Sequence, residues 1–449
     1  MDYKSVVERL FERHRSVQSA GFSADAYKPG LGQMLSYARA LGDPHEAFRS
    51  IHVAGTNGKG TVCSMLAAAL ASEGLRVGLY TSPHLLDFRE RIKIISSGGV
   101  EMIPEETVCS FLDSYDRPGL SFFEITTGMA FRWFADSGVD IAVIETGLGG
   151  RLDSTNIITP ELSVITSVGL DHCDLLGSTR ALITAEKAGI FKPGVPALVW
   201  GRDQETEEVF RSAAAKGASP LYFAEDFDLP AAPAGLEGTE ILNWKVALSA
   251  LEILGHDGYS PAAVADYKKA TGLRGRWEQL CDDPVVICDI GHNPQALEAN
   301  FARLALLRFG RDRDGGTVAA RDHVNGRGPR GSVGGMSGAK FRVPAPAEAQ
   351  EGRPLIVVYG AMADKDVDSI ASLLPPDAEY ILVQPNTPRA MSLSDLALKL
   401  KSLNFTEQQS VAEGVCTALR RARDLHDPII YIGGSTYVVS EAISYFESL

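Results

Sequence analysis

Residues 51–65 read IHVAGTNGKGTVCSM, and the rest of the chain is organised around this stretch. An apolar run stops at Gly55, a glycine-rich turn continues to Thr61, and a helix-forming run extends to Ser72. A strand, a glycine loop and a helix in this order can bind a phosphate chain. Glycines let backbone N–H groups approach the oxygens, and the helix N-terminus adds partial positive charge. The stretch therefore predicts a P-loop unit.

The loop is a variant of the usual P-loop, which has a glycine five residues before the second glycine of the motif. Val53 takes that place here, so the loop is shorter on its first side. We expect Lys59 to reach the outer phosphates and the Thr61 hydroxyl to face a Mg²⁺ ion. A glycine-rich turn without a ligand is the alternative. The position of Gly-Lys-Gly-Thr at the end of a strand favours the phosphate loop.

The composition indicates a cytoplasmic protein of two domains. The chain has 449 residues, too many for one ordinary domain, and 45% of them are hydrophobic. A formal net charge of -14 argues against nucleic acid or a membrane surface as a partner. Six cysteines without a CxxC pair indicate reduced thiols. The charged residues 1–21 predict an amphipathic helix rather than a signal peptide, and no apolar run approaches the roughly 20 residues of a membrane span.

Short apolar runs alternate with helix-like runs after the P-loop, which predicts a parallel sheet covered on both faces. Strands are expected at 76–80, 140–144, 162–166, 197–200, 285–288, 355–359 and 428–432. We place the domain boundary at residue 280, giving a first domain (1–280) that contains the P-loop and a second domain (281–449). Residues 308–353 are dense in Gly, Arg, Asp and Pro, which predicts a disordered insertion within the second domain.

Three candidate metal ligands, Ser82, Glu145 and His172, each follow a predicted strand. The carboxyl ends of parallel strands meet at one edge of a sheet, so these side chains could share one divalent ion. An oxygen-rich shell with one imidazole suits Mg²⁺ or Mn²⁺ better than Zn²⁺. Any one of these residues alone would more often be structural. The basic segment at 89–93 could hold a substrate carboxylate, or could equally be a solvated charged face.

Five motifs occur in a specific order: HVAGTNGKGT (52–61), TSPHL (81–85), RERI (89–92), IETGLGGRLDSTNII (144–158) and DIGHNP (289–294). Together they resemble the folylpolyglutamate synthase/dihydrofolate synthase family of Mur-ligase-like amide ligases. The resemblance covers nearly the whole chain except 308–353. Thr146 and Ile290 depart from the family pattern without removing a chemical group. The implied α/β fold is a P-loop NTPase-like parallel-sheet domain followed by a smaller Rossmann-like domain, as in Mur ligases.

The resemblance also implies roles for individual residues. The ATP-binding residues would be Gly55, Thr56, Asn57, Gly58, Lys59, Gly60, Thr61, Asn243, Arg276 and Asp289. One Mg²⁺ would be held by Thr61, Ser82 and Glu145, and a second by His172. Lys187 matches a family lysine that is carbamylated, which would make it an anionic ligand of the second ion. The catalytic set would be Lys59, His172, Lys187, Asp289 and His292. The substrate-binding set would be Arg89, Phe122, Phe123, Thr126, His292 and Ser435.

The implied reaction joins L-glutamate to dihydropteroate, to the γ-carboxylate of a reduced folate, or to both. ATP would convert the acceptor carboxylate into an acyl phosphate, which the α-amino group of glutamate attacks. Positioning and charge neutralisation by Mg²⁺, Lys59 and Arg276 would supply most of the catalysis. The two domains must close to bring glutamate to the acyl phosphate. We expect a monomer.

Three alternatives remain at this stage. A peptidoglycan Mur ligase uses related chemistry, but only about fifty residues precede the P-loop here, too few for its UDP-binding domain. A regulatory GTPase would need a guanine-reading Asn-Lys-x-Asp motif, which the sequence lacks. A non-catalytic nucleotide-binding module is the third. ATP turnover that requires both glutamate and a pteroate or folate would separate these possibilities.

Overall fold

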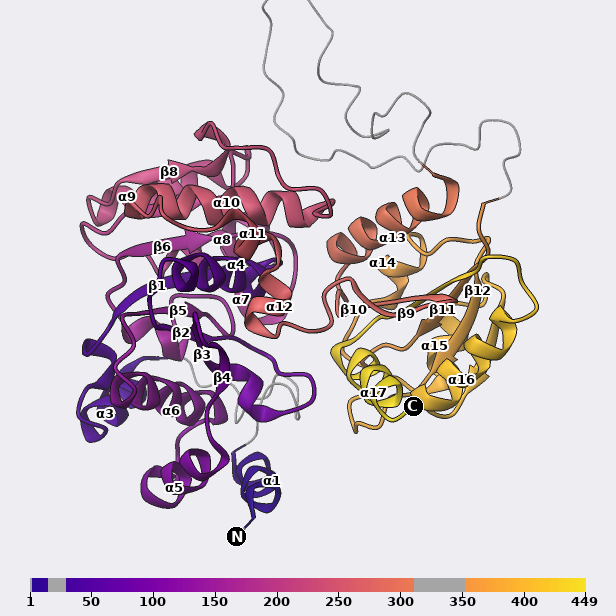
Figure 1. Cartoon of the computed structure of the whole chain (residues 1–449), viewed down its shortest axis with the longest axis horizontal. Helices are drawn as coiled ribbons and strands as arrows, with labels where there is room; N and C mark the ends of the chain where they lie inside the picture. The colour runs from indigo at the N-terminus through magenta and orange to yellow at the C-terminus, as the bar shows by residue number, and fades with distance from the viewer. Residues whose placement is uncertain (1, 15–29, 311–351) are drawn as a thin grey trace, which may run out of the picture. The chain divides into compact units, whose positions relative to one another are not determined.

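The computed structural model describes residues 2–14, 30–310 and 352–449. The chain forms two compact units, Met1–Leu273 and Arg274–Leu449 (Figure 1). This division comes earlier than the boundary at 280 expected from the sequence, because Glu278–Asp282 forms a strand (β9) that pairs within the second unit. Most of the expected insertion at 308–353 and part of the expected N-terminal helix lie outside the described residues.

The first unit contains an eight-stranded sheet in the order β4-β3-β2-β5-β1-β6-β7-β8. The central strand β1 pairs in parallel with β5 and β6, as expected for a P-loop unit. Strands β3 and β4 form an antiparallel hairpin at one edge, which the sequence analysis did not predict. The strands are β1 (Arg49–Ala54), β2 (Val77–Tyr80), β3 (Ile92–Ser96), β4 (Gly99–Met102), β5 (Ile141–Glu145), β6 (Leu162–Ile165), β7 (Ala197–Val199) and β8 (Leu221–Phe223).

Helices cover both faces of this sheet. The α-helices are α1 (Tyr3–Arg13), α3 (Gly32–Ala40), α4 (Lys59–Ser72), α5 (Glu105–Tyr115), α6 (Phe122–Asp136), α7 (Cys173–Leu176), α8 (Arg180–Ala188), α9 (Glu207–Lys216), α10 (Thr239–Leu254), α11 (Pro261–Ala265) and α12 (Tyr267–Thr271). The 3-10 turns are η1 (Pro44–Glu46), η2 (Phe88–Arg91), η3 (Ser154–Ile157) and η4 (Ala224–Asp226). Helix α4 packs against α10, α11 and α12, and Figure 1 shows it beside α10.

Alternation along the buried strands divides the core of the first unit into two layers. Ile141 and Val143 of β5 pack with α4 and α10, whereas Ala142 and Ile144 pack with α6 and α1. Glu145 continues the alternation on the α4 side, where the helix after the phosphate loop begins. Because alternate residues of a strand face the same side, the Glu145 carboxylate lies on the side of the sheet where the phosphate loop begins its helix.

The second unit contains a six-stranded sheet in the order β13-β12-β11-β14-β10-β9, parallel except for the edge strand β9. Its strands are β9 (Glu278–Asp282), β10 (Val285–Asp289), β11 (Leu355–Tyr359), β12 (Glu379–Val383), β13 (Phe405–Gln408) and β14 (Ile429–Gly433). Its helices are α13 (Pro294–Phe309), α14 (Val367–Ala371), α15 (Leu393–Lys399), α16 (Val411–Ala422) and α17 (Thr436–Glu447). The mostly parallel sheets of both units confirm the α/β fold class. No helix in the described ranges has the length and apolar content that a membrane crossing requires.

Candidate active site

The phosphate loop connects β1 to α4, and a side chain on either of two of its glycines would displace a neighbouring residue. Gly58 caps α4 with a φ of 85°, and a Cβ there would lie 2.3 Å from Oδ1 of Asn243. A Cβ on Gly55 would lie 1.9 Å from Oγ1 of Thr166. The loop is therefore packed against α10 on one side and against the segment after β6 on the other.

The segment after β6 holds the loop through hydrogen bonds. The Thr56 N–H donates to the Ser167 carbonyl at 2.8 Å, and the Asn57 N–H donates to the Ser167 hydroxyl at 3.0 Å. The hydroxyls of Thr166 and Ser167 both donate to the Asn57 carbonyl, at 2.7 and 3.0 Å. The sequence analysis assigned no role to these two hydroxyls, although Thr166 ends a predicted strand and Ser167 directly follows it, where polar residues approach the phosphate loop.

Two lysines converge on one carbonyl of the loop. Lys59 Nζ donates to the Gly55 carbonyl at 3.2 Å, and Lys187 Nζ, from α8, donates to the same oxygen at 2.7 Å. Lys187 is buried, and this burial lowers its pKa to about 7, with the positive charge of Lys59 acting in the same direction. The structure thus brings Lys59 and Lys187 together, and their catalytic roles remain predictions.

Glu145 lies at the carboxyl end of β5, directly opposite Val53 of β1 in the sheet register. Its Oε1 is 4.0 Å from Lys59 Nζ, and its Oε2 accepts a hydrogen bond from the Ser82 backbone N–H at 3.0 Å. Thr61, in the first turn of α4, is also buried. The strand order therefore places Lys59, Ser82 and Glu145 at one edge of the sheet.

His172 occupies the turn that opens α7, with a φ of 53°. Its Nε2 is 3.8 Å from a carboxylate oxygen of Asp171, which lies close enough to Lys187 to oppose the lowering of that pKa. The described residues contain no group of three or more His, Cys, Asp or Glu side chains placed to hold a metal. The predicted ligands include only two such side chains, Glu145 and His172. Metal binding by them together with the hydroxyls of Thr61 and Ser82 stays a prediction. These hard oxygen donors suit Mg²⁺.

The basic segment is organised by internal contacts. The Arg89 guanidinium bonds the Asp87 carboxylate, with a closest distance of 2.7 Å, and lies 3.3 Å from Glu105. Arg91 donates to Nδ1 of His84 at 2.7 Å. The Lys93 ammonium donates to the Thr271 carbonyl at 2.8 Å. Arg91 and Lys93 are buried, so the alternative of a solvated charged face is wrong for both residues.

Aromatic residues at the start of α6 line the predicted acceptor side. The Phe122 ring stacks on Phe11 with centroids 4.7 Å apart. The Thr126 hydroxyl is 3.1 Å from the Tyr80 hydroxyl, and the ring of Phe123 lies 5.9 Å from that of Tyr80. Substrate binding by Phe122, Phe123, Thr126 and Arg89 remains a prediction.

In the second unit, Asp289 ends β10 and organises the turn after it. One carboxylate oxygen accepts from the Trp277 N–H at 2.8 Å, and the other accepts from the Gly291 N–H at 2.7 Å and from Asn300 at 2.8 Å. His292 Nδ1 is 3.1 Å from the Ile290 carbonyl. A role for Asp289 in direct contact with ATP remains a prediction.

Two further predicted residues of the second unit, Ser435 and Arg276, differ in whether their polar atoms have hydrogen-bond partners. The Ser435 hydroxyl caps α17 by accepting from the Val438 N–H at 3.2 Å. Arg276 is different, because its Nε is buried and has no hydrogen-bond partner among the described residues. An unpaired buried donor is costly, so this nitrogen is a candidate ligand contact.

Comparison with known proteins identifies the family. Residues 53–229 match the Mur ligase middle domain. The chain is 30% identical to a dihydrofolate synthase/folylpolyglutamate synthase of Haemophilus influenzae, over 92% of this chain and 93% of that protein. The chain belongs to the dihydrofolate synthase/folylpolyglutamate synthase family.

Solved structures of the family agree with this assignment. Escherichia coli FolC in complex with DHPP and ADP has a TM-score of 0.76 and 26% identity, with 100% of this chain and 98% of that chain covered. The bifunctional Yersinia pestis enzyme with Mn, AMPPNP and L-glutamate bound gives the same values. The resemblance read from the five motifs and the two-domain Mur-ligase fold are both confirmed.

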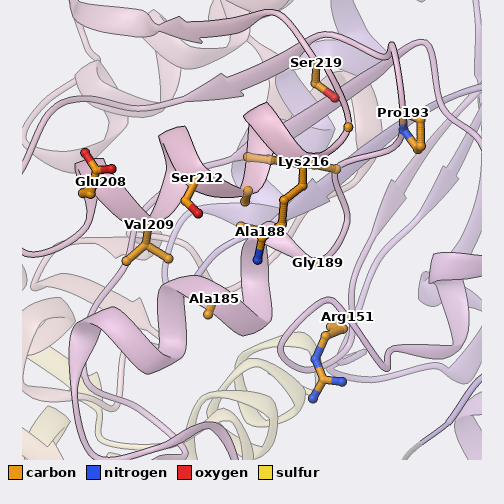
Figure 2. Close-up of a pocket in the computed structure, with 13 residues that line it drawn as sticks. Arg151, Ala185, Ala188, Gly189, Pro193, Glu208, Val209, Ser212, Lys216 and Ser219 are labelled. Atoms are coloured by element: carbon orange, nitrogen blue, oxygen red, sulfur yellow. The ribbon is translucent and has the colours of Figure 1, made fainter.

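A cavity of about 630 Å³ lies between the C-terminal turn of α8 and helix α9, next to the part of the candidate active site that contains Lys187 (Figure 2). Ala188 and Gly189, which directly follow Lys187, line it together with Ser212 and Lys216. Figure 2 shows the Lys216 side chain extending from α9 toward Ala188. None of the residues predicted for the active site lines this cavity.

Proposed function

We propose that the chain is an ATP-dependent ligase that joins L-glutamate to dihydropteroate, to a reduced folate, or to both, through an acyl phosphate. The convergence of Lys59 and Lys187 on the Gly55 carbonyl, with Glu145 beside them, supports this proposal most directly. These groups surround a loop whose two constrained glycines leave its backbone able to approach phosphates. Membership of the folate ligase family supplies the substrate class.

ATP would bind along the phosphate loop and the start of α4. The contacts would come from Gly55, Thr56, Asn57, Gly58, Lys59, Gly60 and Thr61. Asn243 is a reasonable additional contact, because its side chain lies directly against Gly58. Arg276, whose buried Nε has no hydrogen-bond partner among the described residues, would be a further nucleotide contact, and Asp289 would hold the loop that precedes His292.

Divalent metal would be held by Thr61, Ser82 and Glu145, with a second ion at His172 and carbamylated Lys187. The Yersinia pestis relative has Mn and an ATP analogue bound, which supports a metal–nucleotide substrate. Bound Mg²⁺ would neutralise phosphate charge and stabilise the charge that develops during transfer. Thr61, Ser82, Glu145, His172 and Lys187 would orient it.

Carbamylation of Lys187 requires a neutral amine, because an ammonium cannot attack carbon dioxide. A pKa of about 7 leaves a large fraction of Lys187 neutral at physiological pH, whereas an exposed lysine would be almost fully protonated. Mass analysis after alkylation that traps carbamates should therefore find Lys187 modified in bicarbonate buffer. An unmodified Lys187 under those conditions would remove this part of the proposal.

The reaction begins with transfer of the γ-phosphoryl group to the acceptor carboxylate, which yields ADP and the acyl phosphate. The neutral α-amino group of glutamate then attacks the acyl carbon, and the tetrahedral intermediate expels phosphate. Lys59 would neutralise charge on the transferred group. His292 and Ser435 would orient glutamate, while Arg89, Phe122, Phe123 and Thr126 would shape the acceptor side. No side-chain nucleophile takes part. The enzyme would act as a monomer in the cytoplasm.

ADP release measured with each acceptor separately tests the proposal. We expect turnover only when L-glutamate and either dihydropteroate or a reduced folate are both present. The acceptor that supports turnover defines whether the enzyme is a dihydrofolate synthase, a folylpolyglutamate synthase or both. Turnover without glutamate and acceptor would favour a nucleotide switch. Glutamate-dependent turnover on another carboxylic acid alone would favour a different Mur-type ligase.

A further inference from the structure

A buried chain of hydrogen bonds starts beneath the phosphate loop, at His52 of β1. His52 is fully buried, and its Nε2 is 2.8 Å from the Thr155 hydroxyl. That hydroxyl donates to Oδ1 of Asp153. The other Asp153 oxygen, Oδ2, accepts from the backbone N–H groups of Gly147 and Leu148, both at 2.9 Å. The chain thus runs from β1 to the loop that follows Glu145.

The direction of these bonds follows from the groups present. Thr155 has one hydroxyl proton, and it is used toward the Asp153 carboxylate, so the hydroxyl oxygen must accept from His52. His52 therefore carries its proton on Nε2. Its Nδ1 has no hydrogen-bond partner among the described residues, which fits an unprotonated nitrogen. Burial lowers the pKa of His52 to about 3, so the ring stays neutral.

The far end of this chain contacts the predicted acceptor side. A Cβ on Gly147 would lie 2.5 Å from Cζ of Phe123, so the backbone held by Asp153 packs directly on that ring. The Phe123 ring in turn neighbours Tyr80, which is hydrogen-bonded to Thr126. A shift of the Gly147–Leu148 backbone would therefore displace Phe123.

We propose that His52 and Thr155 are positioning residues for the acceptor site, acting through Asp153 and the Gly147–Leu148 backbone on Phe123. They touch neither substrate nor nucleotide in this scheme. The inference depends on the proposed function, because the acceptor role of Phe123 is part of it. Its expected consequence is a change at the acceptor side, since the hydrogen bonds end on the backbone that packs against Phe123. The Asp153 carboxylate also lies close enough to Lys187 to raise its pKa, so the variants leave Asp153 itself in place.

Thr155→Val tests this inference, because valine keeps the shape and removes the hydroxyl. We expect the KM for the acceptor to rise about tenfold, as the loss of one buried hydrogen bond commonly produces, with the KM for ATP nearly unchanged. Thr155→Ser restores the hydroxyl and should recover most of the acceptor affinity. Thr271→Val is the matched control, because Thr271 is equally buried and its hydroxyl bonds the Tyr267 carbonyl within α12.

A second pair of variants applies if Thr155→Val does not fold. His52→Gln keeps an N–H donor near the position of Nε2 and should behave like the wild type, whereas His52→Leu should raise the acceptor KM. An unchanged acceptor KM in folded Thr155→Val, or in folded His52→Leu where Thr155→Val does not fold, would overturn this inference and leave the proposed function standing. So would an equal rise in the ATP and acceptor KM values. A wild-type enzyme without acceptor-dependent turnover would overturn the proposed function and this inference together.

Discussion

Lys59 and Lys187 donate to the same backbone carbonyl, that of Gly55, although they come from different helices. Two ammonium groups so close together repel each other, and burial adds to the cost of charging Lys187. A phosphate chain or a carbamate would relieve this repulsion. The arrangement therefore favours an anionic ligand at the loop, and it leads to the first two predictions.

Lys59→Ala should reduce ligase turnover by at least about a hundredfold, because it removes a charge aimed at the transferred phosphate. The fold should persist, since Lys59 is partly exposed and contributes little to the core. Steady-state ADP release and thermal unfolding measure the two effects. Lys245→Ala, on the exposed face of α10, is the control. Near-normal activity of Lys59→Ala would contradict the loop assignment.

Lys187→Met should change how stability depends on pH. The folded-state pKa of Lys187 is about 7, below the ordinary value of 10.5, so the unfolded chain binds more protons between these two pH values. The wild type should therefore gain stability as pH rises through this window, and the variant should lack this gain. Urea unfolding at pH 6 and pH 9 in bicarbonate-free buffer should differ between the two proteins by about 1–3 kcal/mol. Parallel pH dependence would show that Lys187 titrates normally.

Gly58→Ala should weaken ATP binding strongly. The new Cβ would meet the Asn243 side chain at 2.3 Å, and the φ of 85° is unfavourable for alanine. Adding Asn243→Ala should relieve the steric conflict but not the backbone strain, so binding should recover only in part. Isothermal titration with a non-hydrolysable ATP analogue measures both variants. Gly74→Ala is the control for strain alone, because its φ is 94° and nothing lies near its Cβ. Full ATP affinity in Gly58→Ala would refute close packing at the loop.

His292→Ala should raise the KM for glutamate by about tenfold while changing the KM for ATP little, since His292 is assigned to the amino-acid side. His426→Ala is the control, because His426 is an exposed histidine of the same unit. Equal changes in both KM values would remove His292 from the glutamate site.

The sequence predicted most of the parallel strands, because buried strands show as continuous apolar runs. It did not name β8, β12 or β13, which are also parallel. It missed the β3–β4 hairpin, because Arg91 and Lys93 suggest an exposed segment. Lys93 is instead buried, and its ammonium is satisfied by the carbonyl of Thr271, 178 residues away. It also missed β9, an edge strand with few apolar residues that is recognisable only by its pairing with β10.

By itself, the sequence determined the phosphate loop, the α/β class and the family, because glycine positions, apolar runs and short motifs act over a few residues. Only the tertiary structure decided which polar groups work together. Lys187 is 132 residues from Gly55, and the chain of bonds from His52 to Asp153 spans about a hundred residues. Such contacts depend on strand order, register and burial. The same burial lowers the pKa values of Lys187 and His52, which no local pattern of residues could reveal.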